Sequence, residues 1–388
     1  MGGRAGRAKG EGMNGTETAR EKRIVRRQGA RSAPKSLIPR LALWAGVGVF
    51  VLALALLAAC GDDDGPTEPT PTPPKPSGEG FVWAATDNVS TENWLIKVDV
   101  GTGEIHHRGV KGFETGEWTV GIPTVPETGD FFLHNPGVFL ARYDANGGKI
   151  WREGSTRYNW RDFTSISYYK RGNAIWGMED WSLEKYNGSN GDPLLMKQIG
   201  GLILKPHSPL QVDQNTGAVW AASPNYLIKL SANGIKLYDE EFNTVERSIL
   251  NLAIENRTGN LWALIRVGRP AEKYRLLKYS PGGDRLLAKD TFLIQEPMGM
   301  AVDPYTGEVW LGYQYGVVVH KSNGDYKKSV PNYNNVRAFA FTDTRVIMGG
   351  GEKDRSYCLY GVNKGTGREL WSITGGYRPA KCVSYVKK

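Results

Sequence analysis

The chain has 388 residues, of which 40% are hydrophobic, and it carries 49 Lys or Arg against 40 Asp or Glu. This composition excludes a disordered chain and a polytopic membrane protein, and it provides enough apolar residues for one large core or two modest ones. The 12 Trp and 18 Tyr, with 49 Gly and 21 Pro that follow no three-residue period, favour strands and turns over a helix bundle.

Residues 1–59 combine most of the excess positive charge with an apolar run. They contain 11 Lys or Arg and 3 acidic residues, whereas residues 81–388 contain 37 and 32. Arg31, Lys35 and Arg40 precede an uncharged apolar run over residues 41–59, which is the pattern of a targeting segment. The basic balance therefore belongs mainly to targeting, and an extracytoplasmic position disfavours nucleic acid as a partner.

The apolar run ends in Leu57-Ala58-Ala59-Cys60, which resembles the lipobox of bacterial lipoproteins. This resemblance implies that residues 1–59 are a signal peptide with an extended basic n-region and that Cys60 becomes the lipidated first residue. The alternative is an uncleaved membrane helix, because about 20 apolar residues span a bilayer. In both cases we expect a membrane-anchored protein outside the cytoplasmic membrane, on the outer-membrane or periplasmic face or at the cell surface.

Residues 60–80 consist of Cys60 and a Pro-rich tether, residues 61–80, that has no aliphatic or aromatic side chain. Such a segment has no means of hydrophobic collapse and is expected to lie extended. At about 3.1 Å per residue it reaches roughly 60 Å from the lipid.

Residues 81–388 contain a repeat of about 44 residues that two markers define independently. The first marker is a bulky residue, usually after a Thr-Gly turn, and it recurs at intervals of 37 to 49 residues at Trp83, Phe132, Trp176, Trp220, Trp262, Trp310 and Ile347. The second marker ends an alternating strand and recurs at intervals of 41 to 49 residues at Asp99, Asp144, Asn187, Ser231, Ser280, Ser322 and Asn363. Both markers indicate seven units.

Each unit has the pattern of four short antiparallel strands joined by glycine turns. Four-stranded units with this period predict an all-β fold, a seven-bladed β-propeller over residues 81–388. The first unit lacks its innermost strand, and residues 381–386 form a spare apolar strand after the seventh. We therefore expect the C-terminal strand to complete the first blade and close the ring.

The repeats resemble two propeller families. Segments such as LQVDQNTGAVWAASPNYLIKLSANG are similar to NHL-repeat and streptogramin-lyase-like propellers, whereas LYGVNKGTGRELWSI is similar to the pyrroloquinoline-quinone (PQQ) type repeat. In that second type the Trp of the fourth strand docks between blades. Because a propeller hosts many functions, these resemblances imply architecture rather than activity.

Catalytic patterns are weak in this sequence. The five His residues show no metal-pair spacing, and the W-F-T-E stretch of the lyase family has only Trp176-Gly177-Met178-Glu179 as an approximation. Quinone dehydrogenases are expected to have a vicinal cysteine pair and a calcium site, neither of which is recognisable. We therefore expect no cofactor and no metal. The enzymatic alternative is a lyase or lactonase that uses Glu179 or His207 with a divalent metal.

Two thiols remain after lipidation, Cys358 and Cys382, in a compartment that favours disulfides. A bridge between them would fasten the closing strand to the seventh blade. The alternative is two buried thiols, because a third-strand and an innermost residue are expected to lie near or beyond the roughly 7 Å limit between bridged Cα atoms.

The two faces of the predicted ring differ. Turns between the first and second strands and between the third and fourth strands are short and uniform, and we call their side the short-turn face. The connections on the opposite side, the long-loop face, are expected to be longer and more variable, which is typical of functional loops. The candidate binding residues there are aromatic or Arg side chains: Tyr158, Trp160, Arg161, Trp181, Arg266, Arg269, Tyr313, Tyr315 and Arg378.

Aromatic and Arg side chains are enriched at protein interfaces and on sugar-binding surfaces. The sequence therefore predicts a lipid-anchored, non-catalytic binding or scaffold module of the cell envelope, with a protein partner on the long-loop face. A carbohydrate-binding module is a further alternative. For any single aromatic residue, packing against a neighbouring blade explains its presence equally well.

Overall fold

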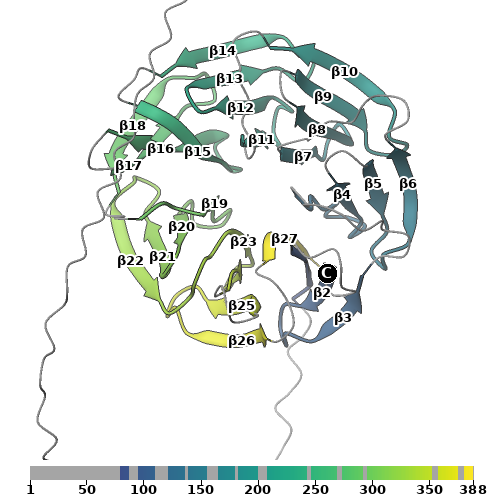
Figure 1. Ribbon diagram of the computed structural model, residues 1–388, viewed down its shortest axis with the longest axis vertical. Helices are drawn as coiled ribbons and strands as arrows, with labels where there is room; N and C mark the ends of the chain where they lie inside the picture. Colours follow the sequence, from purple (N-terminus) through teal and green to yellow (C-terminus); the bar gives the residue numbers. More distant parts are fainter. Residues whose placement is uncertain are drawn as a thin grey trace, which may run out of the picture. The chain divides into compact units, whose positions relative to one another are not determined.

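The computed structural model describes residues 79–86, 95–109, 121–135, 139–154, 165–179, 182–199, 208–242, 246–268, 273–291, 295–351, 357–374 and 380–387. These residues form seven antiparallel sheets, arranged as blades around a ring (Figure 1). We number the blades 1 to 7 along the chain by their second strands. The predicted all-β, seven-bladed propeller is confirmed.

The strands fall into four positions from the axis to the rim. Innermost are β7 (Ser165–Tyr169), β11 (Leu210–Val212), β15 (Glu246–Glu255), β19 (Gly299–Val302), β23 (Ala338–Phe341) and β27 (Ala380–Val386). Second are β1 (Phe81–Thr86), β4 (Phe131–Asn135), β8 (Ala174–Glu179), β12 (Val219–Ser223), β16 (Asn260–Val267), β20 (Val309–Tyr313) and β24 (Arg345–Gly349). Third are β2 (Leu95–Asp99), β5 (Phe139–Tyr143), β9 (Ser182–Asn187), β13 (Tyr226–Leu230), β17 (Lys273–Tyr279), β21 (Gly316–His320) and β25 (Tyr357–Asn363). Outermost are β3 (Ile105–Arg108), β6 (Lys149–Gly154), β10 (Pro193–Gln198), β14 (Lys236–Glu241), β18 (Arg285–Asp290), β22 (Tyr326–Pro331) and β26 (Glu369–Thr374).

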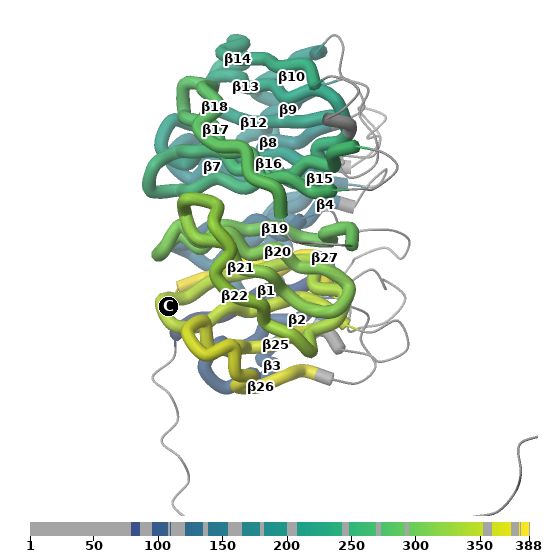
Figure 2. Tube along the Cα trace, turned by 90° about the vertical axis from the view of Figure 1, so that its left-hand side faces the viewer, coloured from purple at the N-terminus to yellow at the C-terminus, as the bar shows by residue number. Residues whose placement is uncertain are grey.

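The C-terminal strand closes the ring as expected. β27 pairs antiparallel with β1, with Phe81 opposite Val386, and blade 1 has the strand order β27-β1-β2-β3. Both ends of the propeller chain therefore meet in one sheet at the short-turn face. Figure 2 shows the ring from its side, with the C-terminus at the left-hand edge.

Blade 2 differs from the other blades at its innermost position. Its sheet contains β4, β5 and β6, and residues 121–125 take the inner place through a single bridge between Thr124 and Phe131. Pro123 and Pro126 border this bridge and have no N–H to donate to a ladder. The inner segment therefore reaches its place without forming a regular strand.

The hydrophobic core consists of seven clusters, one between each pair of neighbouring blades. The cluster between blades 7 and 1 includes Ile347 and Leu359 on one side and Val82 and Ile96 on the other. Closure thus buries the last interface between blades as it buries the others.

A cation of each blade joins it to the next blade by donating to a backbone carbonyl near the third-to-fourth-strand turn. The pairs are Lys97 to Ala145 O at 2.6 Å, Arg142 to Gly188 O at 3.0 Å, Lys185 to Ala232 O at 2.9 Å, Lys229 to Pro281 O, Lys278 to Ser322 O at 3.0 Å, Lys328 to Gly365 O at 3.0 Å and Arg345 to Val100 O at 2.8 Å. In five blades the Lys ammonium also lies over a buried Trp ring, for example 4.9 Å from the centroid of Trp262. We call this arrangement the cation clamp.

Blades 2 and 7, whose second strands carry Phe132 and Ile347 in place of Trp, use a Trp of the outer strand instead. Trp151 Nε1 donates to Gly188 O at 2.9 Å, and Trp371 Nε1 donates to Val100 O at 2.9 Å. Both carbonyls belong to the next blade. In these two blades a Trp of the fourth strand therefore links its blade to the next one.

Candidate functional site

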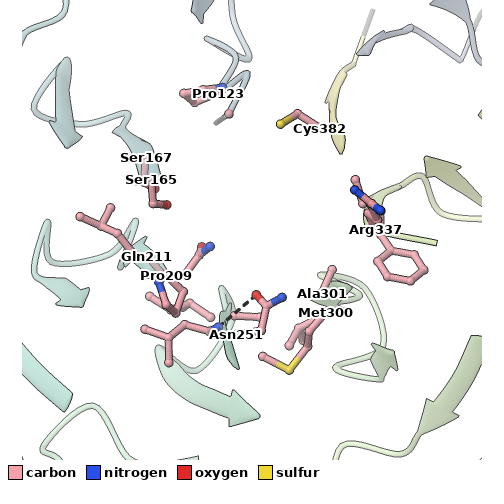
Figure 3. Close-up of a pocket in the computed structure, with 18 of the residues that line it drawn as sticks. Pro123, Ser165, Ser167, Pro209, Gln211, Asn251, Met300, Ala301, Arg337 and Cys382 are labelled. Carbon is pink, nitrogen blue, oxygen red and sulfur yellow. Dashed lines mark hydrogen bonds between the residues drawn. The ribbon is translucent and has the colours of Figure 1, made fainter. Parts of the chain in front are cut away.

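The inner strands enclose a central cavity of about 860 Å³ (Figure 3). Residues from all seven blades line it, including Pro123 of blade 2, Gln211 of blade 4 and Ser384 of blade 1. Cavities of roughly 300–1,000 Å³ are typical of small-ligand sites. This cavity is therefore large enough for a small molecule.

Strand alternation explains which side chains reach the cavity. In β7, Ser165 and Ser167 are half-buried and alternate with buried residues, and in β11 Gln211 lies between buried Leu210 and Val212. Because successive side chains of a strand point to opposite sides, these polar residues face the axis. The alternation of polar and apolar residues in the predicted inner strands is the sequence signal that could have identified these residues.

The lining mixes apolar and polar side chains and has few ionisable groups. Ser165, Ser167, Gln211 and Asn251 offer hydroxyl or amide groups, and the ionisable lining residues are Glu296, Arg337 and Cys382. In Figure 3, Arg337 and Cys382 lie on one side of the cavity, and the Ser165–Ser167 strand lies on the other.

Arg337 immediately precedes β23 at the long-loop end of the channel, in a segment held on both sides by its neighbours. Arg337 N donates to Gly349 O at 2.8 Å, Val336 N to Tyr313 O at 3.4 Å and Asn335 N to Gln314 O at 3.0 Å. We call residues 332–337 the inter-blade strap, because it joins blade 6 to blade 7. Its close approach requires glycine in blade 6, since a Cβ on Gly299 would lie 2.2 Å from Arg337 O.

Three of the predicted surface residues lie on the described part of the long-loop face. Arg266, near the end of β16, forms an ion pair with Glu296. Tyr313 ends β20, and Tyr315, in the turn to β21, is 57% exposed. Met298 N donates to Gly312 O at 2.8 Å, so the segment that carries Glu296 also contacts β20. These contacts place the three residues on one rim across blades 5 and 6.

The predicted lipidation site Cys60 lies outside the described residues. The same holds for the other predicted surface residues, which are Tyr158, Trp160, Arg161, Trp181, Arg269 and Arg378. The apolar run of residues 41–59 also lies outside the described residues. Within the described part of the chain, no helix is long and apolar enough to cross a membrane.

The connections on the long-loop face vary between blades as expected, but they are not long in every blade. Only two residues separate β8 from β9, β12 from β13, and β20 from β21. In these blades the second and third strands form tight hairpins, so the length on this face comes mainly from connections between blades.

The proposed cysteine pair spans the last blade junction. Cys358 lies in the third strand β25 of blade 7, and Cys382 lies in the innermost strand β27 of blade 1, where it lines the cavity. The strand positions are those expected from the sequence. The side chain of Cys358 lies outside the described part, so the bridge stays a prediction.

The described histidines do not converge on the cavity. His106 and His107 lie in the outer strand β3, and His134 and His320 lie in β4 and β21. Burial lowers the pKa of His134 to about 3, which keeps this side chain neutral. Among the described residues, no three His, Cys, Asp or Glu side chains gather as metal ligands. His207 and the side chain of Glu179 lie outside that part of the chain.

No protein-family model and no curated protein sequence matches the chain. Solved structures share its fold, among them the Raptor protein of Chaetomium thermophilum, with a TM-score of 0.56 and 12% sequence identity. That match covers 71% of this chain and 26% of the Raptor chain, so the described fold corresponds to a minor part of that protein. At this identity the similarity shows the propeller fold alone.

Proposed function

We propose that the protein is a lipid-anchored, extracytoplasmic binding module whose partner is a protein of the cell envelope that docks on the long-loop face. The anchor is the diacylglycerol-modified Cys60, and residues 61–80 are the tether. The proposal rests on the Leu57-Ala58-Ala59-Cys60 pattern for the location and on the propeller for the binding role.

The observation that carries the binding role is the contrast between the two faces. At the short-turn face, the described basic side chains of the cation clamp are occupied with the carbonyls of the next blade. At the long-loop face, Tyr315 is 57% exposed, and Arg266 lies on the rim in an ion pair with Glu296. Exposed aromatic and Arg side chains contribute strongly to protein interfaces.

Acyl labelling tests the location. Cells that express the full chain are grown with a clickable palmitate analogue, and the protein is recovered and probed for the label. We expect labelled wild-type protein and unlabelled Cys60→Ser, because the thiol is the predicted attachment atom. Label on both forms, or on neither, contradicts the anchor.

A crosslinking pull-down from envelope membranes tests the binding surface. The variant carries Trp160→Ala, Arg161→Ala and Trp181→Ala, and a matched control carries Leu194→Ala, Met196→Ala and Leu237→Ala on exposed outer-strand positions. We expect one envelope protein to be captured by the wild type and the control and lost in the first variant. Equal capture by all three proteins contradicts this surface.

A further inference from the structure

We propose that the central cavity binds a small organic anion, one that carries a carboxylate or phosphate group, and that Arg337 is the residue that holds it. This inference goes beyond the docking of a protein on the rim. It requires neither the lipid anchor nor the protein partner, because the cavity residues belong to the propeller alone.

The charge of Arg337 is not compensated within the described part of the chain. No described side chain forms an ion pair with it, and its Nε is buried without a hydrogen-bond acceptor. The carboxylate that lines the cavity, Glu296, is paired with Arg266. Buried polar groups without a partner are rare in proteins, and a missing ion is one of the ordinary reasons for them.

Arg337 differs in this respect from the basic residues of the cation clamp. Each clamp residue, such as Arg345 or Lys278, donates to a carbonyl of the next blade. Arg337 has the same charge but lies at the long-loop face, whereas the clamp lies at the short-turn face. It has no such carbonyl acceptor among the described residues. A structural role of the clamp type therefore does not explain its presence.

The inter-blade strap fixes the backbone from which the guanidinium extends. Arg337 N is bonded to Gly349 O, and the carbonyl of Arg337 fits against Gly299, where there is no room for a Cβ. A charged group on a fixed backbone loses little freedom when it binds a ligand, which favours affinity. The planar guanidinium matches the two oxygens of a carboxylate or phosphate.

The opposite wall suits the polar body of the same ligand. Ser165, Ser167 and Gln211 lie across the cavity from Arg337, and Asn251 lies between the two sides (Figure 3). Hydroxyl and amide groups both donate and accept hydrogen bonds. Together with Arg337, these groups give the cavity of about 860 Å³ several hydrogen-bonding positions for a small anion, beside apolar lining residues such as Met300 and Phe339.

Calorimetric titration of the detergent-solubilised full chain tests the proposal. Citrate is the carboxylate probe, inorganic phosphate is the phosphate probe and glycerol is the neutral probe, all at one ionic strength. Arg337→Gln removes the charge, and Arg368→Gln is the matched control, because Arg368 is an exposed arginine of the same blade at the short-turn end. Circular dichroism verifies that each variant is folded, and Arg337→Lys serves if Arg337→Gln does not fold.

We expect saturable binding of citrate or phosphate by the wild type and by Arg368→Gln, and at least a tenfold weaker affinity in Arg337→Gln. Arg337→Lys retains the charge without the planar fork and is expected to bind with intermediate affinity. Binding of citrate alone assigns a carboxylate, and binding of phosphate alone assigns a phosphate. The proposal is overturned if neither anion binds saturably, if Arg337→Gln binds as the wild type does, or if glycerol binds equally well.

Discussion

Single cations hold neighbouring blades together at the short-turn face. Lys278 illustrates how one side chain combines three contacts: it forms a 3.0 Å ion pair with Glu255, donates to Ser322 O and lies over the ring of Trp262. Both Lys278 and Glu255 are largely buried, so each depends on the other for compensation of its charge. The basic residues of the propeller thus serve the interfaces between blades.

Replacing Lys278 by Met is therefore expected to destabilise the propeller. The substitution keeps the apolar stem but leaves the Glu255 carboxylate without its ion pair, which costs about 3–5 kcal/mol for a buried pair and less where water reaches it. Urea unfolding measures the change. Lys273→Met, at an exposed position of the same strand, is the control and is expected to change stability little. Equal stability of the two variants contradicts the clamp.

A buried histidine gives the stability a defined pH dependence. The pKa of His134 is lowered to about 3 by burial, whereas a histidine in the unfolded chain titrates near 6.5. As the pH falls from about 6.5 toward 3, the unfolded state takes up a proton that the folded state does not. The free energy of unfolding should therefore fall in this window by about 1.4 kcal/mol per pH unit from this one group.

His134→Gln is expected to flatten this slope, because glutamine does not titrate. The measurement is the free energy of unfolding in urea at several pH values between 4 and 7. His106→Gln is the control, since the His106 side chain is 38% exposed and lies in the outer strand. If the wild type and His134→Gln share one slope, the buried neutral histidine is not the cause.

At the scale of elements, the inter-blade strap shows how glycines in strands position a loop. Gly312 of β20 pairs with Gly299 of β19, and both face the backbone of residues 336–337. The sequence shows these glycines but not their partner, because the partner lies more than 20 residues away in the next blade. The position of a glycine in a strand pattern does not show which loop packs against that strand.

Gly312→Ala is expected to destabilise the protein by about 1–3 kcal/mol, since the added Cβ would lie 2.2 Å from Val336 O. The displaced strap should also weaken any anion binding at Arg337. Thermal unfolding and citrate titration measure the two effects. Gly282→Ala is the control, because the nearest atom to its added Cβ is a side-chain oxygen at 3.4 Å. An unchanged melting temperature in Gly312→Ala refutes the close approach.

The strands themselves were largely predictable. The Trp and Ile markers, from Trp83 to Ile347, lie in the second strands, because a hydrophobic repeat and glycine turns recur at a fixed period. The candidate site was less predictable. Tyr313 and Tyr315 follow from their residue type and their place in a predicted loop of the long-loop face. Arg337 and Gln211 do not follow from the sequence, because the axis of a ring is defined only when all blades are assembled.

At the scale of the whole molecule, stability depends on closing the ring. β27 pairs with β1 along its length, and the cluster between blades 7 and 1 includes Ala380 from this strand. Arg345 and Trp371 add hydrogen bonds to Val100 across the same junction. The first and last parts of the propeller therefore fold as one cooperative unit.

Removing residues 380–388 is expected to abolish cooperative unfolding, because β1 loses its inner neighbour and the apolar cluster at the junction is opened. Circular dichroism melting and gel filtration of the truncated chain measure this loss. Removal of Lys387 and Lys388 alone, which leaves β27 intact, is the control and should melt like the wild type. A cooperative transition at the wild-type temperature in the longer truncation contradicts ring closure by β27.

Site-specific photocrosslinking in living cells is the most direct test of a protein partner on the long-loop face. A benzophenone amino acid replaces Tyr315 at the long-loop face or Tyr305 in the Thr-Gly turn of the short-turn face, which are 57% and 39% exposed. We expect one discrete light-dependent adduct with an envelope protein from position 315 and none from position 305. No adduct from position 315, or the same adduct from both positions, contradicts a protein partner on this face.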